Sequence, residues 1–354
     1  MATYERFKEL LKDPEITEIM VNGTKGIFIE KFGQKRELDF SFENEQEIME
    51  IIKEIFSSQG KRIDKYHPYA DVCLEDGTRV NAIIPPLARQ GPSITVRKFS
   101  TNLKSLDDLV ANHTLTEKAA KFLVACVKGK LNILISGATG SGKTTTLEML
   151  SYHISEEERI ITIEDTAELK VHHKNLVSLE TRDPDEEGKG EVTLRDLIKN
   201  ALRMRPDRII LGEVRGEEAL DLIQAVSTGH RGTLAVIHGN SPSEVLARLE
   251  TLILSSGIKL PPEEIRKMIA QTINIIIQQE QLSDGSRKIT HIAELRGLER
   301  GEIVVQDIFA FKMEGKTPEG RIKGRLKPVM RMYPKFFSEF QKLGLLDEKV
   351  FSDG

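Results

Sequence analysis

The sequence predicts an α/β protein in two parts: a smaller α+β module, then a larger unit built around a mainly parallel sheet. Two observations predict this. Strand-like and helix-like segments alternate in the second part, the order typical of parallel strands with crossover helices. Residues 1–98 instead place short strands between tight turns. The 354 residues have room for two or three domains, and the 39% apolar and 30% charged content is that of a globular protein.

The amino-terminal module, residues 1–98, is expected to pack helices against a mostly antiparallel sheet. A helix is expected from Tyr4 to Leu11, and another over residues 45–56, where apolar side chains recur at helical spacing. The expected strands lie between glycine-containing turns, at residues 18–22, 26–31, 36–40 and 93–99, with a hairpin at 71–84. The polar residues 99–112 are expected to connect the two domains.

Residues 113–300 are expected to form the domain with the parallel sheet. Its expected strands are residues 133–136, 159–164, 208–213 and 233–238, followed by a hairpin around Ser283-Asp284-Gly285. Its expected helices are residues 117–127, 143–153, 194–203 and 217–227. In such sheets functional groups gather at the carboxyl ends of the strands, so the residues after each strand are the candidates for a site.

The strongest functional signal is the glycine-rich turn after the first of these strands. Gly137, Gly142, Lys143 and Thr144 fill the pattern G-x-x-x-x-G-K-[ST] between an expected strand and an expected helix. Glycines allow backbone N–H groups to approach phosphates, and the amino end of the following helix attracts the anion. Lys143 is expected to reach the β- and γ-phosphates, and the Thr144 hydroxyl to ligate Mg²⁺. The expected nucleotide-binding residues of the turn are Gly137, Ala138, Thr139, Gly140, Ser141, Gly142, Lys143, Thr144 and Thr145.

Two further strand ends carry acidic side chains. The second strand ends at Glu164, followed by Asp165, and adjacent carboxylates beside a nucleotide suit an attacking water or a hydrated Mg²⁺. The third strand ends at Glu213, one residue after Gly212, which occupies the position where an aspartate is typical. Glu213 can hold a metal-bound water or polarise the nucleophile. The alternatives are an acidic pair that caps the next helix, and a solvated glutamate after a core strand.

Two histidines bracket the fourth strand, His230 before it and His238 at its end. Two histidines around one strand of a nucleotide-binding sheet suggest a role in sensing the γ-phosphate. The alternative is that they are structural residues. Metal ligation by these histidines is not expected, because no third ligand lies nearby in the sequence.

In this order, the motifs resemble those of the secretion-superfamily ATPases, the hexameric motors of type II and type IV secretion, type IV pili and archaeal flagella. The likeness covers nearly the whole chain. It rests on GATGSGKTTT as Walker A, TIEDTAEL as the Asp box, RMRPDRIILGEVRG as an atypical Walker B with glutamate, and TGHRGTLAVIHGNSP as the His box. The segments EIMVNG, RVNAIIPPLARQGPSITVRKF and RMRPDRIILGEVRGEEALD most resemble the tight-adherence or Flp-pilus assembly ATPases, the CpaF subfamily. One departure is Gly239, where many members have alanine.

The resemblance implies a RecA-like P-loop ATPase domain preceded by a PAS-like α+β domain, with ATP and Mg²⁺ as cofactors and a homo-hexamer as the assembly. It implies Glu164 as the base for water and Glu213 as the metal-water ligand, roles that the two could exchange, with Thr144 completing the metal site. It also implies that arginines of the amino-terminal module reach the nucleotide. The best candidates are Arg97 and Arg79, for which the alternative is a surface arginine on a strand.

The carboxy-terminal part, residues 301–354, is expected to form a basic appendage. Residues 312–335 hold eight Lys or Arg against two acidic residues, so that segment carries a net charge of +6 (8 − 2) in a chain whose total is −4. For a chain that resembles these motors, the resemblance implies an inner-membrane platform protein as partner, and this charge suits contact with that protein or with anionic lipid head groups. The alternative is an exposed charged hairpin and helix.

Composition argues against other classes of protein. Net acidity, the absence of Trp and 5% aromatic residues argue against a binder of stacked single strands, so no nucleic-acid partner is expected. A RecA-like nucleic-acid translocase and a nucleotide-switched scaffold with little turnover remain the rival functions. No apolar run reaches 18 residues and no signal peptide is visible, so the expected location is cytoplasmic, at the periphery of the inner membrane.

Overall fold

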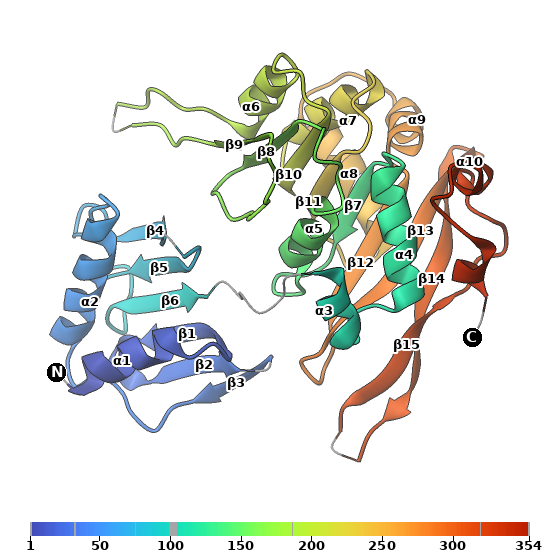
Figure 1. The fold of residues 1–354 in the computed structure, drawn as a ribbon. Helices are drawn as coiled ribbons and strands as arrows, with labels where there is room; N and C mark the ends of the chain where they lie inside the picture. The colour runs from blue at the N-terminus through green and yellow to red at the C-terminus, as the bar shows by residue number, and fades with distance from the viewer. Residues whose placement is uncertain are drawn as a thin grey trace. The chain divides into compact units, whose positions relative to one another are not determined.

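The computed structural model describes residues 2–31, 33–74, 76–98, 105–185, 187–318 and 320–352. The chain divides into two compact units (Figure 1). The first comprises Met1–Leu103 with Asp284–Ser286, and the second Lys104–Ser283 with Arg287–Gly354. Among the described residues, no helix is both long and apolar enough to cross a membrane.

The first unit contains a six-stranded antiparallel sheet covered by two helices. The strands are β1 (Ile16–Asn22), β2 (Ile27–Lys31), β3 (Gln34–Glu37), β4 (Tyr69–Cys73), β5 (Arg79–Ile83) and β6 (Ser93–Arg97), in the order β3-β2-β1-β6-β5-β4. The helices are α1 (Ala2–Lys12) and α2 (Glu45–Ser58), with the 3₁₀ turn η1 (Gly23–Lys25). Asn44 caps α2 by accepting a hydrogen bond from the N–H of Glu47 (3.0 Å). Phe7 of α1 and Phe56 of α2 share one core with the inward side chains of the strands.

The second unit is built on a nine-stranded mixed sheet. Its strands are β7 (Ile133–Ser136), β8 (Ile160–Glu164), β9 (Leu176–Glu180), β10 (Arg208–Val214), β11 (Leu234–Ile237), β12 (Ile275–Gln281), β13 (Arg287–Glu299), β14 (Glu302–Lys316) and β15 (Ile322–Pro328). Their order is β15-β14-β13-β12-β7-β11-β10-β8-β9. The pairings from β12 through β9 are parallel, and those from β12 through β15 antiparallel. The expectation of a mainly parallel sheet therefore describes only the half that carries the phosphate turn.

Helices cover this sheet on both faces. They are α3 (Leu106–Ala111), α4 (Glu117–Lys128), α5 (Lys143–Ser151), α6 (Leu194–Ala201), α7 (Glu218–Ser227), α8 (Pro242–Ser255), α9 (Pro262–Thr272) and α10 (Phe337–Lys342), with the 3₁₀ turn η2 (Glu348–Phe351). Helices α6 to α9 share one core with alternate side chains of the parallel strands, such as Ile161 and Leu211. Intervening side chains such as Ile160 and Ile210 are equally buried. Burial on both faces explains why these strands are continuous apolar runs.

Residues 301–354 do not form a separate appendage, which corrects the expected domain division. Strand β14 pairs with β13, and β15 with β14, so both extend the central sheet. The segment after β15 packs back on α4, where the ring centroid of Phe122 lies 6.0 Å from that of Phe336 and 5.9 Å from that of Phe351. The basic residues of β14 and β15 favoured the prediction of an exposed appendage, but buried Phe309 and Leu326 anchor these strands to the core.

The expected connector, residues 99–112, also differs from the structure. Residues 99–104 lie outside the described residues, and 106–111 form α3 of the second unit. Ser105 and Asp108 form a capping box, in which the N–H of Ser105 donates to the Asp108 carboxylate (2.9 Å). This Ser-x-x-Asp signal was present in the sequence.

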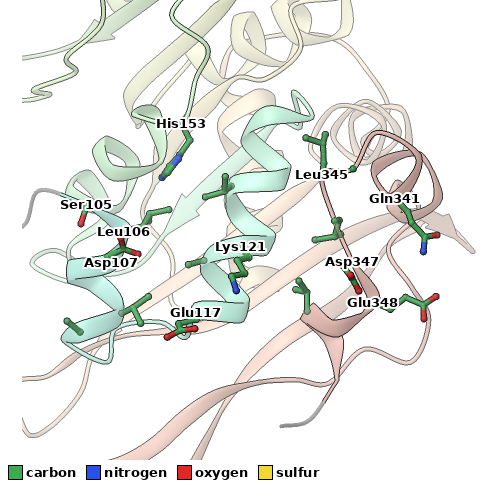
Figure 2. Close-up of a pocket in the computed structure, with 17 residues that line it drawn as sticks. Ser105, Leu106, Asp107, Glu117, Lys121, His153, Gln341, Leu345, Asp347 and Glu348 are labelled. Carbon is green, nitrogen blue, oxygen red and sulfur yellow. The ribbon is translucent and has the colours of Figure 1, made fainter.

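A groove of about 1100 Å³ lies in the second unit between α3, α4 and the carboxy-terminal segment (Figure 2). Apolar side chains such as Leu106 and Val124 form its walls, and acidic side chains such as Asp107 and Glu348 lie at its rim. None of the residues predicted to bind phosphate lines it.

Candidate nucleotide-binding site

The glycine-rich turn joins buried β7 to the first residue of α5 in a conformation that needs glycine. Gly142, which precedes α5, has φ 98°, and a Cβ there would lie 2.9 Å from the Gln279 amide nitrogen. At Gly137 a Cβ would lie 2.1 Å from the Gln279 carbonyl oxygen. The turn is therefore pressed against β12, and its two pattern glycines are sterically required. Ala138, Thr139 and Gly140 are exposed at its tip.

Two buried glutamines of β12 brace this turn, and the sequence interpretation missed them. The Thr146 hydroxyl donates to Gln279 Oε1 (2.7 Å). Gln278 bonds the Ser136 hydroxyl and donates from Nε2 to the Gly239 carbonyl (3.1 Å). Both glutamines are buried. The signal that could have found them is a Gln-Gln pair that directly follows three isoleucines in one strand, because buried amides need partners.

Lys143 lies at the first position of α5 and is only 7% exposed. Its Nζ donates to the carbonyl oxygen of Ala138 (2.8 Å), so the ammonium lies over the turn itself. Together with the amino end of α5, this arrangement fits a phosphate chain. Among the described residues, no group of three or more His, Cys, Asp or Glu side chains could hold a metal ion. A Mg²⁺ ion here would therefore also need oxygens from phosphate, water or the Thr144 hydroxyl.

Glu164 ends β8 as a buried carboxylate, 4% exposed. Its Oε2 accepts hydrogen bonds from the N–H groups of Glu168 (2.9 Å) and Leu169 (3.0 Å). These bonds go to an irregular segment, so Glu164 does not cap a helix. A Cβ at Gly212 would lie 2.8 Å from Glu164 Cγ. The glycine at the position where aspartate is typical is thus explained, because Glu164 fills the space.

Glu213 forms the centre of a polar network at the end of β10. Its Oε1 lies 3.0 Å from His238 Nε2, and its Oε2 lies 3.0 Å from Arg215 Nη2. Arg215 in turn contacts Asp165 (3.1 Å). Burial and the positive charge of Lys143 lower the pKa of His238, although Glu213 acts in the opposite direction. The network therefore links the ends of β8, β10 and β11 next to the phosphate turn.

The structure does not bring His230 to this site, which corrects the expected shared role of the two histidines. His238 follows the carboxyl end of β11, whereas His230 precedes its amino end and has Nδ1 3.1 Å from the Ala225 carbonyl oxygen. The four residues of β11 span about 13 Å. One chain therefore cannot place both imidazoles on the same phosphate.

The two candidate arginines lie together on the sheet of the first unit. Arg97 of β6 is directly opposite Arg79 of β5, and its guanidinium contacts Glu18 (3.0 Å). Their reach to a nucleotide stays a prediction.

Comparison with known proteins assigns this arrangement to a family. The family model described as "Type II/IV secretion system protein" matches residues 2–307. The chain belongs to this type II/IV secretion family. A putative conjugal transfer protein of Mycobacterium tuberculosis is 34% identical over 296 residues, which cover 82% of this chain and 84% of that protein. Protein VirB11 of Agrobacterium fabrum is 32% identical over 299 residues, covering 76% and 86%.

Solved structures show the fold of this type II/IV secretion family member. The ATPase DotB of Legionella pneumophila has a TM-score of 0.58 at 22% identity, covering 81% of this chain and 79% of that chain. The pilus retraction motor PilT has a TM-score of 0.57 at 20% identity, covering 98% and 89%. The resemblance to secretion ATPases is confirmed at the level of the family. The CpaF subfamily stays a prediction.

Proposed function

We propose that this type II/IV secretion family member is the subunit of a homo-hexameric ATPase that works at the cytoplasmic face of the inner membrane. It hydrolyses ATP to power assembly or retraction of a type IV-like pilus, or secretion across that membrane. The observation that most supports turnover is the position of Glu164 and of the Glu213–His238 pair at strand ends beside the phosphate turn. Segments such as EIMVNG favour the CpaF subfamily within this function.

The residues of the site take distinct roles in this proposal. Backbone N–H groups of the turn and Lys143 bind the phosphates. Thr144 and Glu213 would hold Mg²⁺, which would neutralise phosphate charge. Glu164, oriented by two backbone N–H groups, takes the proton of the attacking water. His238 stays largely neutral near pH 7 and holds Glu213 in place. Glu164 and Glu213 could exchange their roles.

The motor action requires the first unit to respond to the nucleotide. Arg97 and Arg79 are the proposed contacts, since positive charge from outside the phosphate turn stabilises phosphoryl transfer. Closure of that unit on ATP and its release after hydrolysis, staggered around a six-subunit ring, would move an inner-membrane platform protein. Arg97→Ala should then lower turnover without unfolding the chain, and unchanged kinetics would count against this contact.

The first experiment is a measurement of phosphate release by the wild type and by Lys143→Ala. Lys143→Ala should remove most of the turnover while the protein stays folded, and turnover at the wild-type rate would sink the site assignment. Adding single-stranded DNA or RNA tests the rival nucleic-acid translocase, which predicts stimulation. A folded wild type that binds ATP and does not turn it over would indicate a nucleotide-switched scaffold.

A further inference from the structure

The segment between β8 and β9, residues 165–175, has neither helix nor strand, yet its backbone is held by side chains. It begins at Asp165, which contacts Arg215 of the polar network (3.1 Å). The consecutive N–H groups of residues 168–170 all donate to buried carboxylates. Glu164 accepts the first two, and Oε1 of Glu148 accepts that of Lys170 (2.8 Å).

The helix that starts at the phosphate turn holds this segment at one residue. Glu148 of α5 accepts the N–H of Lys170, and the Tyr152 hydroxyl, one turn later, donates to the Lys170 carbonyl (3.1 Å). The ring of Tyr152 also stacks on His172 at 6.0 Å. Glu148 lies five residues, about 7.5 Å along the axis, from Lys143. The backbone of residue 170 is therefore tied to α5 on both its N–H and its carbonyl side.

A glutamate at this position is a poor choice for stability alone. Glu148 is 3% exposed and lies near the buried carboxylate of Glu164. A buried acid costs free energy that an apolar side chain of similar size would not. An apolar side chain, however, would leave the N–H of Lys170 without its acceptor. Glu148 therefore provides an acceptor for the N–H of Lys170, which an apolar side chain could not do.

We propose that Glu148 is a positioning residue for ATP hydrolysis: by holding Lys170 it fixes residues 165–175, and with them Glu164 and Asp165, relative to the phosphate turn. This inference rests on the proposed ATPase function. The N–H groups of residues 168 and 169 orient the carboxylate of Glu164. The hydrogen bond between Glu148 and the neighbouring residue 170, here called the grip, therefore fixes the position of the Glu164 carboxylate. Nucleotide binding depends on the turn itself and does not require this grip.

The test compares Glu148→Met, which keeps most of the buried volume, with Glu148→Gln, which keeps an acceptor oxygen. Glu148→Met should lower kcat by between about tenfold and a hundredfold, because a small misplacement of a catalytic group costs that much, while KM for ATP changes by less than about twofold. Glu148→Gln should restore kcat to within about threefold of the wild type. Amide hydrogen exchange of residues 168–171 should accelerate in Glu148→Met only.

The matched control is Glu294 of β13, which is also buried and accepts a backbone N–H, that of Lys335 (2.7 Å). Glu294→Met should lower the unfolding temperature. At temperatures where this variant is still folded, its kcat should equal that of the wild type. A folded Glu148→Met with wild-type kcat, or a Glu148→Gln as slow as Glu148→Met, would overturn the proposal.

A wild type without turnover would refute the proposed function rather than this inference. Hydrogen exchange then decides alone. Faster exchange of residues 168–171 in Glu148→Met would support the grip, and unchanged exchange would overturn it.

Discussion

At the scale of single residues, steric exclusion explains the least usual feature of the site. Gly212 stands where an aspartate is typical, and the space beside it contains the side chain of Glu164. The acidic function is thereby divided between Glu164 on β8 and Glu213 on β10. Both acids and the glycine are visible in the sequence. Only the packing shows that the observed position of the Glu164 side chain is possible because residue 212 is a glycine.

Substitution of Gly212 tests this dependence. Gly212→Ala places a Cβ 2.8 Å from Glu164 Cγ, so the free energy of unfolding should fall by about 1–3 kcal/mol and turnover should fall with it. Urea titration measures the first effect and phosphate release the second. Glu164→Ala, which removes Cγ, should relieve the clash, so the double variant should lose less stability than the two single variants together. A double variant whose loss of unfolding free energy equals the sum of the losses in the two single variants would contradict the clash.

At the scale of elements, the two ends of the parallel strands have different tasks. Their carboxyl ends carry the site, and their amino ends carry a buried ion pair. Arg208, at the start of β10 and 1% exposed, forms two hydrogen bonds with Glu158 (2.7 and 3.0 Å), and Lys130 contacts the same carboxylate. Burial alone would raise the pKa of Glu158, but these cations outweigh it and lower the pKa to about 2.

This ion pair predicts an acid-dependent stability. Because the pKa of Glu158 is lower in the folded state than its ordinary 4.5, the pair contributes fully above about pH 4.5. The contribution, of order 3 kcal/mol, is lost as the pH falls toward 2. Glu158→Gln should therefore unfold at lower urea than the wild type at pH 7, and the difference should shrink on acidification. Glu187→Gln, which breaks an exposed pair with Lys189, should change stability little, and an equal loss in both variants would contradict the prediction.

Periodicity predicted most of these elements, and its failures have physical causes. Strands buried on both faces and amphipathic helices were readable because their side chains report local burial. The short helix α3 was missed because it has only 6 residues, too few to show a helical period, and only its capping box marks its start. The site was predicted in part, since the phosphate turn, Glu164 and Glu213 follow from strand ends. Gln278 and Gln279 were not predicted, because the pairing of β12 with β7 is a long-range contact.

At the scale of the whole molecule, charge is unevenly distributed. The edge strand β15 places Lys323, Arg325 and Lys327 at alternate positions, so that these three share one face, and Arg321 directly precedes the strand. Glu314 of β14 lies 3.6 Å from Arg325 and 3.1 Å from Lys327, and it neutralises part of this charge. A basic edge strand also resists pairing with other sheets. A net positive face on a chain of charge −4 is suited to an anionic surface.

Neutralising this face tests membrane recruitment. The triple variant Lys323→Gln, Arg325→Gln and Lys327→Gln should bind anionic phospholipid vesicles more weakly, since each such charge contributes about 1 kcal/mol near the surface. Three such charges give about 3 kcal/mol, so the expected loss of affinity in co-sedimentation is on the order of a hundredfold. The wild type itself should lose affinity as salt rises from about 0.05 M to about 0.5 M, because screening shortens the range of the attraction. The matched control removes the same charge from the first unit, with Lys53, Lys61 and Lys65 replaced by Gln. If both triple variants bind the vesicles equally weakly, net charge rather than this face directs recruitment. If the β15 triple variant binds as tightly as the wild type, the basic residues are only an exposed charged hairpin without a role in recruitment.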